Sequence, residues 1–339
     1  MAALDLSTLS APPGAAEPAS VHAPAPLISI VIPTFRRAVA LRRALASCTV
    51  QTPAPDAEIV VVDNCPHGSA RELVNVFAAS SSLPVRYVHE RTAGVAAARD
   101  AGVATARGTF IAFLDDDEEA APQWLAELVR AQAQLQADVV FGPVVARAEP
   151  GAGEETDAGV LEEALRIFGR SFPEGTGPMK PSRHALLGTG NSLFRRELLA
   201  GRRFDPSLGL TGGEDTAILK PLILEGRSIA WCKEAVVSEY VPEQRLTLRS
   251  IMSRRFSAGQ GRTATCALTE PRQPVKAAQW MVIGAAQAVL SAGAAAAAIV
   301  VKPSRAAAYA ASAAAGAGKV LWMWPFRIRR YPTLEERLR

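Results

Sequence analysis

Short runs rich in Ile and Val alternate with helical stretches over the first 145 residues, and this alternation constrains the fold more than any other feature of the sequence. Each run is followed by turn-forming residues and then by a segment with helical periodicity. The strand-like runs lie at 27–35, 58–63, 85–89 and 109–114, and the helical stretches at 38–48, 71–80 and 94–107. The pattern predicts an α/β fold with a Rossmann-like open sheet.

Two of these runs end directly in aspartate. Asp63 closes the second run, and the fourth leads straight into Asp115, Asp116 and Asp117. Ligands of open α/β sheets bind beyond the carboxyl ends of the strands, so we expect these acids in a ligand crevice. Such carboxylates can hold Mg2+ or Mn2+, which in turn can neutralise a diphosphate. The triplet is also compatible with the acidic first turn of a helix.

A second acidic pair, Glu214 and Asp215, follows Gly212 and Gly213. The glycines permit a close approach of the backbone or a positive φ, so they can present the acids to a cleft. A carboxylate within hydrogen-bond reach of a substrate proton can act as a general base. The alternative is a glycine turn followed by the acidic N-terminus of a helix.

The charge of the chain is unevenly distributed. The formal net charge is +4, but residues 302–339 contain eight basic and two acidic residues, so the preceding body is slightly acidic. A nucleic-acid partner is therefore not expected for that body. The four cysteines form no CxxC pair, which argues against a cysteine metal site. Residues 1–26, rich in Ala and Pro and without Lys or Arg, are expected to form a disordered tail.

Residues 277–301 carry no charge, and this length exceeds the roughly 20 residues that span a bilayer. Many of them are alanines, which favour lipid only weakly. Trp322 and Trp324 lie close to Arg327, Arg329 and Arg330, a combination typical of a membrane interface. The sequence favours membrane association and leaves open a span or an Ala-rich hairpin packed on the soluble domain.

Six motifs in order resemble those of the family 2 inverting glycosyltransferases. They cover roughly residues 27–262 and are the segments 30–35, 61–64, 94–102, 113–117 with 124–125, 189–191 and 212–215. Segments 62–70 and 239–245 are most similar to the bacterial exopolysaccharide branch typified by succinoglycan glucosyltransferases. Glu239 stands where many relatives have His, which also favours this branch. Asn64 replaces an acid found in many members, and His67 replaces a small or acidic loop residue, so the nucleotide stays open.

This resemblance implies a GT-A fold, which we expect at 27–265. Composition and charge place the tail before it and a helical, basic, membrane-associated region at 266–339 after it. It implies inverting transfer of a sugar from a nucleotide-sugar donor, first of all a UDP-sugar. The expected acceptor is a polyprenyl-diphosphate-linked saccharide or another glycan, and the expected place is the cytoplasmic face of a bacterial inner membrane. A sugar nucleotidyltransferase and an inactive membrane scaffold are the alternatives.

The resemblance also implies roles for individual residues. Asp215, with Glu214 beside it, matches the catalytic base, Asp117 is expected to bind the metal, and Asp115 both the metal and the sugar nucleotide. Further contacts with the donor are expected from Pro33, Thr34, Arg36, Asp63, Arg99, Asp116, Arg254 and Arg255. The two last arginines are equally compatible with a solvated basic helix face.

Two tryptophans and three histidines are expected to be structural or at the surface. Large aromatic side chains dominate core burial, so Trp124 and Trp231 are expected in the core. His67, His89 and His184 are scattered along the chain and are expected to be structural or at the surface.

Overall fold

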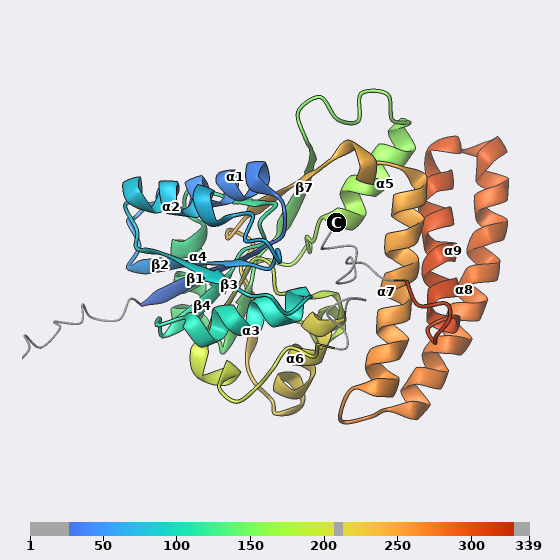
Figure 1. Ribbon diagram of the computed structural model, residues 1–339. Coiled ribbons are helices and arrows are strands. Elements are labelled where there is room, and N and C mark those ends of the chain that lie inside the picture. The colour runs from blue at the N-terminus through green and yellow to red at the C-terminus, as the bar shows by residue number, and fades with distance from the viewer. Residues whose placement is uncertain (1–26, 207–212, 329–339) are drawn as a thin grey trace, which may run out of the picture.

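A computed structural model describes residues 27–206 and 213–328 (Figure 1). The predicted tail at 1–26, Gly212, Arg329 and Arg330 lie outside these residues. The predicted alternation of strands and helices is confirmed in the first half of the chain. Its elements are β1 (Ile28–Thr34), α1 (Ala38–Thr49), β2 (Ala57–Asp63), α2 (Arg71–Ser80), β3 (Val85–His89), α3 (Val95–Thr105) and β4 (Phe110–Phe113).

The central sheet is open and mixed, with the strand order β3-β2-β1-β4-β9-β6-β10-β8. The first four strands in this order are parallel, whereas β9 runs antiparallel to both of its neighbours, β4 and β6. The second half of this sheet consists of β6 (Val139–Phe141), β8 (Gly177–Pro178), β9 (Ser192–Arg195) and β10 (Ile229–Trp231). Because β1, β2, β3 and β4 are parallel, their carboxyl ends meet at one edge, where a ligand crevice is expected.

A smaller sheet, in the order β5-β11-β7, lies beside this edge. Its strands are β5 (Glu118–Ala120), β7 (Val144–Ala148) and β11 (Val237–Val241). The acidic triplet leads into β5, not into a helix, so the helix-start alternative for Asp115 to Asp117 is wrong.

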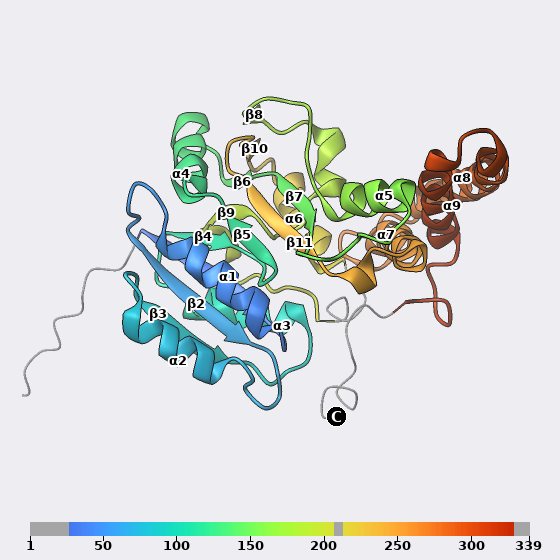
Figure 2. The ribbon, with the colours of Figure 1, turned by 90° about the horizontal axis from the view of Figure 1, so that it is seen from above.

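Helices cover both faces of the central sheet (Figures 1 and 2). One core lies under α1, α2 and α4 (Trp124–Leu135), and the other under α3 and α6 (Glu214–Leu224). The strands β1 and β2 are buried along their whole length, as expected for strands that are covered on both faces. Trp124 and Trp231 are fully buried, which confirms that both belong to the core.

The C-terminal part is a group of helices beside the α/β unit (Figures 1 and 2). It contains α7 (Leu248–Leu268), α8 (Pro274–Val301) and α9 (Ala306–Val320), and α5 (Ala158–Phe168) packs against α7 and α9. Short 3-10 turns occupy Pro181–Leu186, Arg196–Leu199, Glu243–Arg245 and Pro303–Arg305. The helices α8 and α9 form the hairpin that the sequence left as an alternative.

Glycines allow α7 and α9 to approach closely. A Cβ atom added at Gly259 of α7 would lie 2.2 Å from the carbonyl oxygen of Ala315 in α9. A Cβ atom at Gly318 of α9 would lie 2.0 Å from the carbonyl oxygen of Phe256 in α7. These distances are far below van der Waals contact, so the backbones themselves touch. By contrast, α8 turns most of its apolar side chains outward, and within the described residues it is the one helix long and apolar enough to cross a membrane.

Candidate active site

The end of β1, the end of β4 and the start of α6 open onto one cavity of about 1830 Å³. Pro33 and Thr34 line it from β1, the aspartate triplet from the end of β4, and Glu214 and Asp215 from α6. The cavity also extends to α7, α8 and α9. It thus brings together nearly all the predicted site residues, from segments more than 180 residues apart in sequence.

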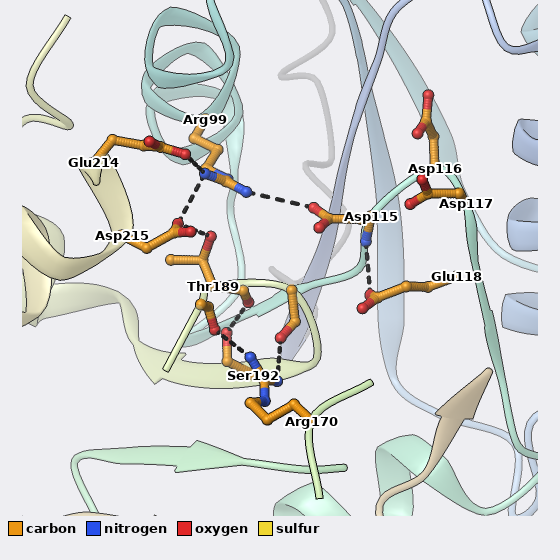
Figure 3. Close-up of polar contacts among 12 residues, drawn as sticks. Arg99, Asp115, Asp116, Asp117, Glu118, Arg170, Thr189, Ser192, Glu214 and Asp215 are labelled. Atoms are coloured by element: carbon orange, nitrogen blue, oxygen red, sulfur yellow. Dashed lines mark hydrogen bonds and ion pairs between the residues drawn. The ribbon is translucent and has the colours of Figure 1, made fainter. Parts of the chain in front are cut away.

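Arg99 connects the two predicted acidic groups (Figure 3). This arginine projects from α3, its side chain is only 5% exposed, and its Nη1 atom donates to Glu214 Oε1 at 2.9 Å and Asp215 Oδ1 at 2.8 Å. Its Nη2 atom lies 3.5 Å from Asp115 Oδ1. One guanidinium group therefore sets the relative positions of carboxylates from β4 and α6.

The start of α6 combines both interpretations of the glycine-acid segment. Gly213 adopts a φ of 108° and caps the helix, and Glu214 and Asp215 form its first turn. Asp215 is a quarter exposed to the cavity and accepts a hydrogen bond of 2.6 Å from Thr189 Oγ1. Glu214 is buried, and burial and the Asp215 carboxylate raise its pKa to about 7. The helix start is therefore acidic and also faces the cavity.

Asp116 and Asp117 are held by arginine and by the loop after β1. Asp116 is buried, accepts from Thr34 Oγ1 at 2.8 Å and pairs with Arg37 at 2.9 Å. Burial raises its pKa to about 6. Asp117 pairs with Arg37 at 2.6 Å and with Arg245 at 3.5 Å. Among the residues described, Arg37 lines the cavity where Arg36 was predicted, and Arg36 hydrogen-bonds the thiol of Cys65 instead.

Several of the carboxylates at this edge have raised pKa values because they are buried close to one another. Burial raises the pKa of Asp115, and the carboxylates of Asp117 and Asp215 raise it further. Burial and neighbouring acids also raise the pKa of Glu118, and that of Glu239 to about 8. Gly190 leaves room beside Asp115, because a Cβ atom there would lie 2.7 Å from Asp115 Oδ2. Hard oxygen ligands with excess negative charge and free space fit a divalent cation.

A tighter group of potential ligands lies elsewhere. Among the described residues, the ligand atoms of Glu127, Cys232 and Glu234 lie within 4.8 Å of one another, and these residues do not line the cavity. Burial raises the pKa of the Cys232 thiol, and Arg130 pairs with both glutamates. The ion pairs with Arg130 already compensate the charge of the two glutamates.

Asp63 lies at the end of β2 as predicted, but it is fully buried. Its carboxylate accepts from the backbone amides of Cys65 at 2.9 Å and Ala70 at 2.7 Å and from the hydroxyl of Tyr87 at 3.1 Å. Its neighbour Asn64 lines the cavity. In this arrangement Asp63 shapes the loop 64–70, and its contact with a nucleotide stays a prediction.

The two predicted arginines of α7 are partly buried and point to different surroundings. The guanidinium of Arg254 lies 4.2 Å from the ring centre of Phe168 and lowers the pKa of Glu239, against a net rise from burial. Arg255 lies among other cations, Arg166 and Arg262, and its pKa is lowered chiefly by burial. Both line the cavity, so neither is simply part of a solvated helix face.

Arg170 belongs to the site but could not be singled out from the sequence. It is buried deeply enough to lower its pKa, and its guanidinium donates to the carbonyl oxygens of Gly142, Gly188 and Asn191. It thus holds the segment that carries Thr189. His67 is exposed and His89 contacts the Cys65 carbonyl oxygen, whereas His184 lines the cavity and burial lowers its pKa.

Comparisons with known proteins agree with this geometry. Residues 29–201 match the family model described as Glycosyl transferase family 2. The succinoglycan biosynthesis protein ExoM of Rhizobium meliloti is 34% identical over 237 residues, which cover 69% of this chain and 73% of that protein.

Two solved structures share the fold. A mannosyltransferase of Pyrobaculum calidifontis, in complex with GDP-Man and Mn2+, has a TM-score of 0.54 and 20% identity over 86% of this chain and 87% of its own. S. aureus TarS 1-349, in complex with UDP, has a TM-score of 0.51 and 15% identity over 86% of this chain and 89% of its own. These similarities confirm the expected GT-A fold. With the order of its motifs, the family match and the carboxylates gathered at one sheet edge, the chain belongs to glycosyltransferase family 2 and is a glycosyltransferase.

Proposed function

We propose that the protein transfers a sugar from a nucleotide-diphosphate sugar to a hydroxyl group of a lipid-linked saccharide or another glycan, with inversion at the anomeric carbon. The observation that carries this proposal is the Arg99 bridge, which holds Asp115 and Asp215 around one cavity. A donor bound at Asp115 then lies next to a carboxylate that can receive a proton.

Asp215 acts as the base in this proposal. Thr189 and Arg99 orient its carboxylate, and its exposed quarter faces the cavity. It removes the proton of the acceptor hydroxyl while the oxygen attacks the anomeric carbon from the face opposite the diphosphate. A single displacement of this kind inverts the anomeric centre. Glu214 does not face the acceptor, because it is buried and its partner is Arg99, so we assign it a positioning role.

Asp115 and Asp117 would hold a divalent cation, Mg2+ or Mn2+. When bound, the cation neutralises charge on the leaving diphosphate. The crowded carboxylates and the space at Gly190 support this assignment, as does the Mn2+ in the related mannosyltransferase structure. On the protein side, Arg254 lines the cavity and its charge acts on Glu239, so we assign it to the diphosphate as a source of positive charge.

A UDP-sugar is the first donor to test. Pro33, Thr34 and Asn64 line the part of the cavity at the ends of β1 and β2, where we place the nucleotide. The TarS structure contains UDP and the mannosyltransferase structure contains GDP-Man, so both nucleotide classes belong in the assay.

We propose that the acceptor lies at a membrane and that the transfer serves exopolysaccharide synthesis. The related ExoM is by its name a succinoglycan biosynthesis protein. Val282, Val289 and Val300 of α8 are each more than 70% exposed. If α8 crossed the bilayer in this packing, Arg262 and Lys319 beside its Trp280 would be carried to bilayer depth, which is costly. We therefore propose that α8 lies in the interface, at the cytoplasmic face of the membrane.

The test is a transfer assay with UDP-, GDP- and dTDP-sugars, lipid extract as acceptor and Mn2+ or Mg2+. We expect a nucleoside diphosphate as product, whereas a nucleotidyltransferase would release pyrophosphate. Asp215→Asn should abolish transfer and retain donor binding, and Asp56→Asn at an exposed site is the matched control. Transfer at the wild-type rate by Asp215→Asn would refute the base assignment. Absence of nucleotide-sugar binding by the wild type would refute the proposed donor.

A further inference from the structure

The cavity continues past the acidic site to a cluster of three cations from different helices. The members of this cationic cluster are Arg255 and Arg262 of α7 and Lys319 of α9, and all three line the cavity. At about 1830 Å³ the cavity is well above the roughly 300–1000 Å³ of a typical small-molecule site. It has room for a second ligand beside the donor.

Within residues 27–206 and 213–328, the cluster has no acidic partner. In the described part of the chain, none of its three members pairs with a carboxylate. Glu163, the carboxylate whose charge acts on the pKa of Arg255, already binds Arg166 through both of its oxygens, at 2.5 and 2.6 Å. The Arg255 Nε atom is buried and has no hydrogen-bond partner. Lys319 donates to the amide oxygen of Gln287 at 2.5 Å, which leaves its charge uncompensated.

The three side chains repel one another and are held together by the backbone. Burial and the charges of Arg262 and Arg255 lower the pKa of Lys319, and burial lowers the pKa of Arg262. The close backbone contacts at Gly259 and Gly318 keep α7 and α9 from moving apart. Burying like charges without a counter-ion costs free energy, and an anion between them reverses the sign of that contribution.

The chemistry of the cluster fits a diphosphate. Guanidinium groups bind phosphate oxygens through paired hydrogen bonds, and an ammonium group adds a compact charge. Residues 248–328 contain ten basic residues and one acidic residue, so the surroundings favour a multiply charged anion.

The position of the cluster indicates which diphosphate it binds. Trp280 of α8 covers it, with its ring centre 4.8 Å from the Arg262 guanidinium carbon and 5.3 Å from Lys319 Nζ. The same helix exposes its apolar side chains on the outside of the molecule. The acidic residues that we assign to donor and metal follow β4 and begin α6, in the α/β unit, whereas the cluster comes from α7 and α9 of the helical group beside that unit (Figure 1). A ligand with a charged head and a long apolar tail satisfies both features of the helical end.

We propose that Arg255, Arg262 and Lys319 bind the diphosphate of a membrane-anchored isoprenoid acceptor, separately from the donor. This inference rests on the proposed function for the identity of the acceptor. Its test is a binding measurement that needs no turnover, so the two can fail independently.

The experiment measures binding of farnesyl diphosphate to the full-length protein by calorimetry, with UDP and Mn2+ present. We expect binding by the wild type and a loss of about tenfold or more in affinity for Arg262→Gln/Lys319→Gln, because hydrogen bonds to two charged groups are lost. The matched control Lys302→Gln/Arg305→Gln removes two exposed charges from the same region and should bind like the wild type. Both variants should bind UDP unchanged, which shows that they are folded.

Three results would overturn the proposal. Displacement of farnesyl diphosphate by UDP would place it in the donor site. Equal affinities of both double variants would remove the cluster from recognition. Unchanged farnesyl diphosphate binding by Arg262→Gln/Lys319→Gln, together with lost binding to phosphatidylglycerol vesicles, would make the cluster a general headgroup site. Competition by inorganic pyrophosphate at similar affinity would support recognition of the diphosphate itself.

Discussion

At the scale of single residues, the site depends on one buried charge. Arg99 is surrounded by three carboxylates, and two of its contacts, with Glu214 and Asp215, are shorter than 3 Å. Removing one partner of a buried ion pair leaves the other without compensation, which costs more than the pair itself contributes. Arg99 therefore matters for stability as well as for the placement of Asp215.

Arg99→Met should lower the free energy of unfolding by about 3–5 kcal/mol, because Glu214 remains buried without its cation. The double variant Arg99→Met/Glu214→Gln should lose less than the sum of the two single variants. Urea denaturation of all four proteins measures this coupling. Arg202→Met breaks an exposed pair with Glu225 and should cost less than about 1 kcal/mol. Additive losses would contradict the coupling.

The pKa of Glu214 predicts a pH dependence of stability. The group faces Arg99 and Asp215, and its pKa rises from 4.5 to about 7 on folding. The folded chain therefore holds this proton more tightly than the unfolded chain. This tighter proton binding by Glu214 contributes on the order of 3 kcal/mol to the free energy of unfolding. The contribution is complete below pH 4.5 and is lost as the pH rises to about 7. Relative to Glu214→Gln, the wild type should lose Tm over this range, and a constant difference between the two proteins would contradict the assignment.

At the scale of elements, the local sequence pattern was sufficient to predict a strand wherever its immediate neighbours in the sheet bury it. The strands β1 and β2 are almost continuously apolar in sequence. Asp63 is the last residue of β2, as predicted, and the loop after β1 contains Arg37. The shift from Arg36 to Arg37 could not be predicted, because Arg36 adopts a φ of 55° in a turn that sequence patterns do not reveal. The role of Arg170 could not be predicted for a similar reason, because it depends on carbonyl groups that only tertiary packing brings close together.

Alanine should have opposite effects at two glycines, because Gly293 is exposed on α8 whereas Gly318 lies where α9 packs against α7. Alanine normally stabilises a helix by about 1 kcal/mol relative to glycine. Gly293 of α8 has open space around it, so Gly293→Ala should raise the Tm slightly. Gly318→Ala should lower the free energy of unfolding by about 1–3 kcal/mol, and with it the Tm, because its Cβ would overlap the Phe256 carbonyl oxygen. Thermal unfolding of both variants tests this, and stabilisation by Gly318→Ala would show that the two backbones are not in contact.

At the scale of the whole molecule, the catalytic unit and the helical group share one cavity. The predicted boundary between residues 265 and 266 falls within α7, whose residues line that cavity from its helical side. Arg262 and Lys319 are 57 positions apart in an alanine-rich region, and only the fold brings them together. The net charge of the C-terminal part could be predicted from the sequence. The separation of the cationic cluster inside the cavity from the apolar side chains on the outer face could not.

The outer face of α8 should control membrane association without affecting the donor site. Val282, Val289 and Val300 are spaced by 7 and 11 residues, which places them on one stripe of the helix, and they are 72%, 73% and 84% exposed. Changing all three to Gln should reduce binding to liposomes containing anionic lipid by at least about tenfold, since each buried valine contributes about 1.5 kcal/mol or more. Val39, Val50 and Val76 are similarly exposed on or beside α1 and α2, and changing those three to Gln is the matched control. Liposome flotation measures the binding, and UDP affinity should be equal in both variants. If the α8 variant floats like the wild type, the protein does not use this face to reach the membrane, and the lipid-linked acceptor must be presented from another side.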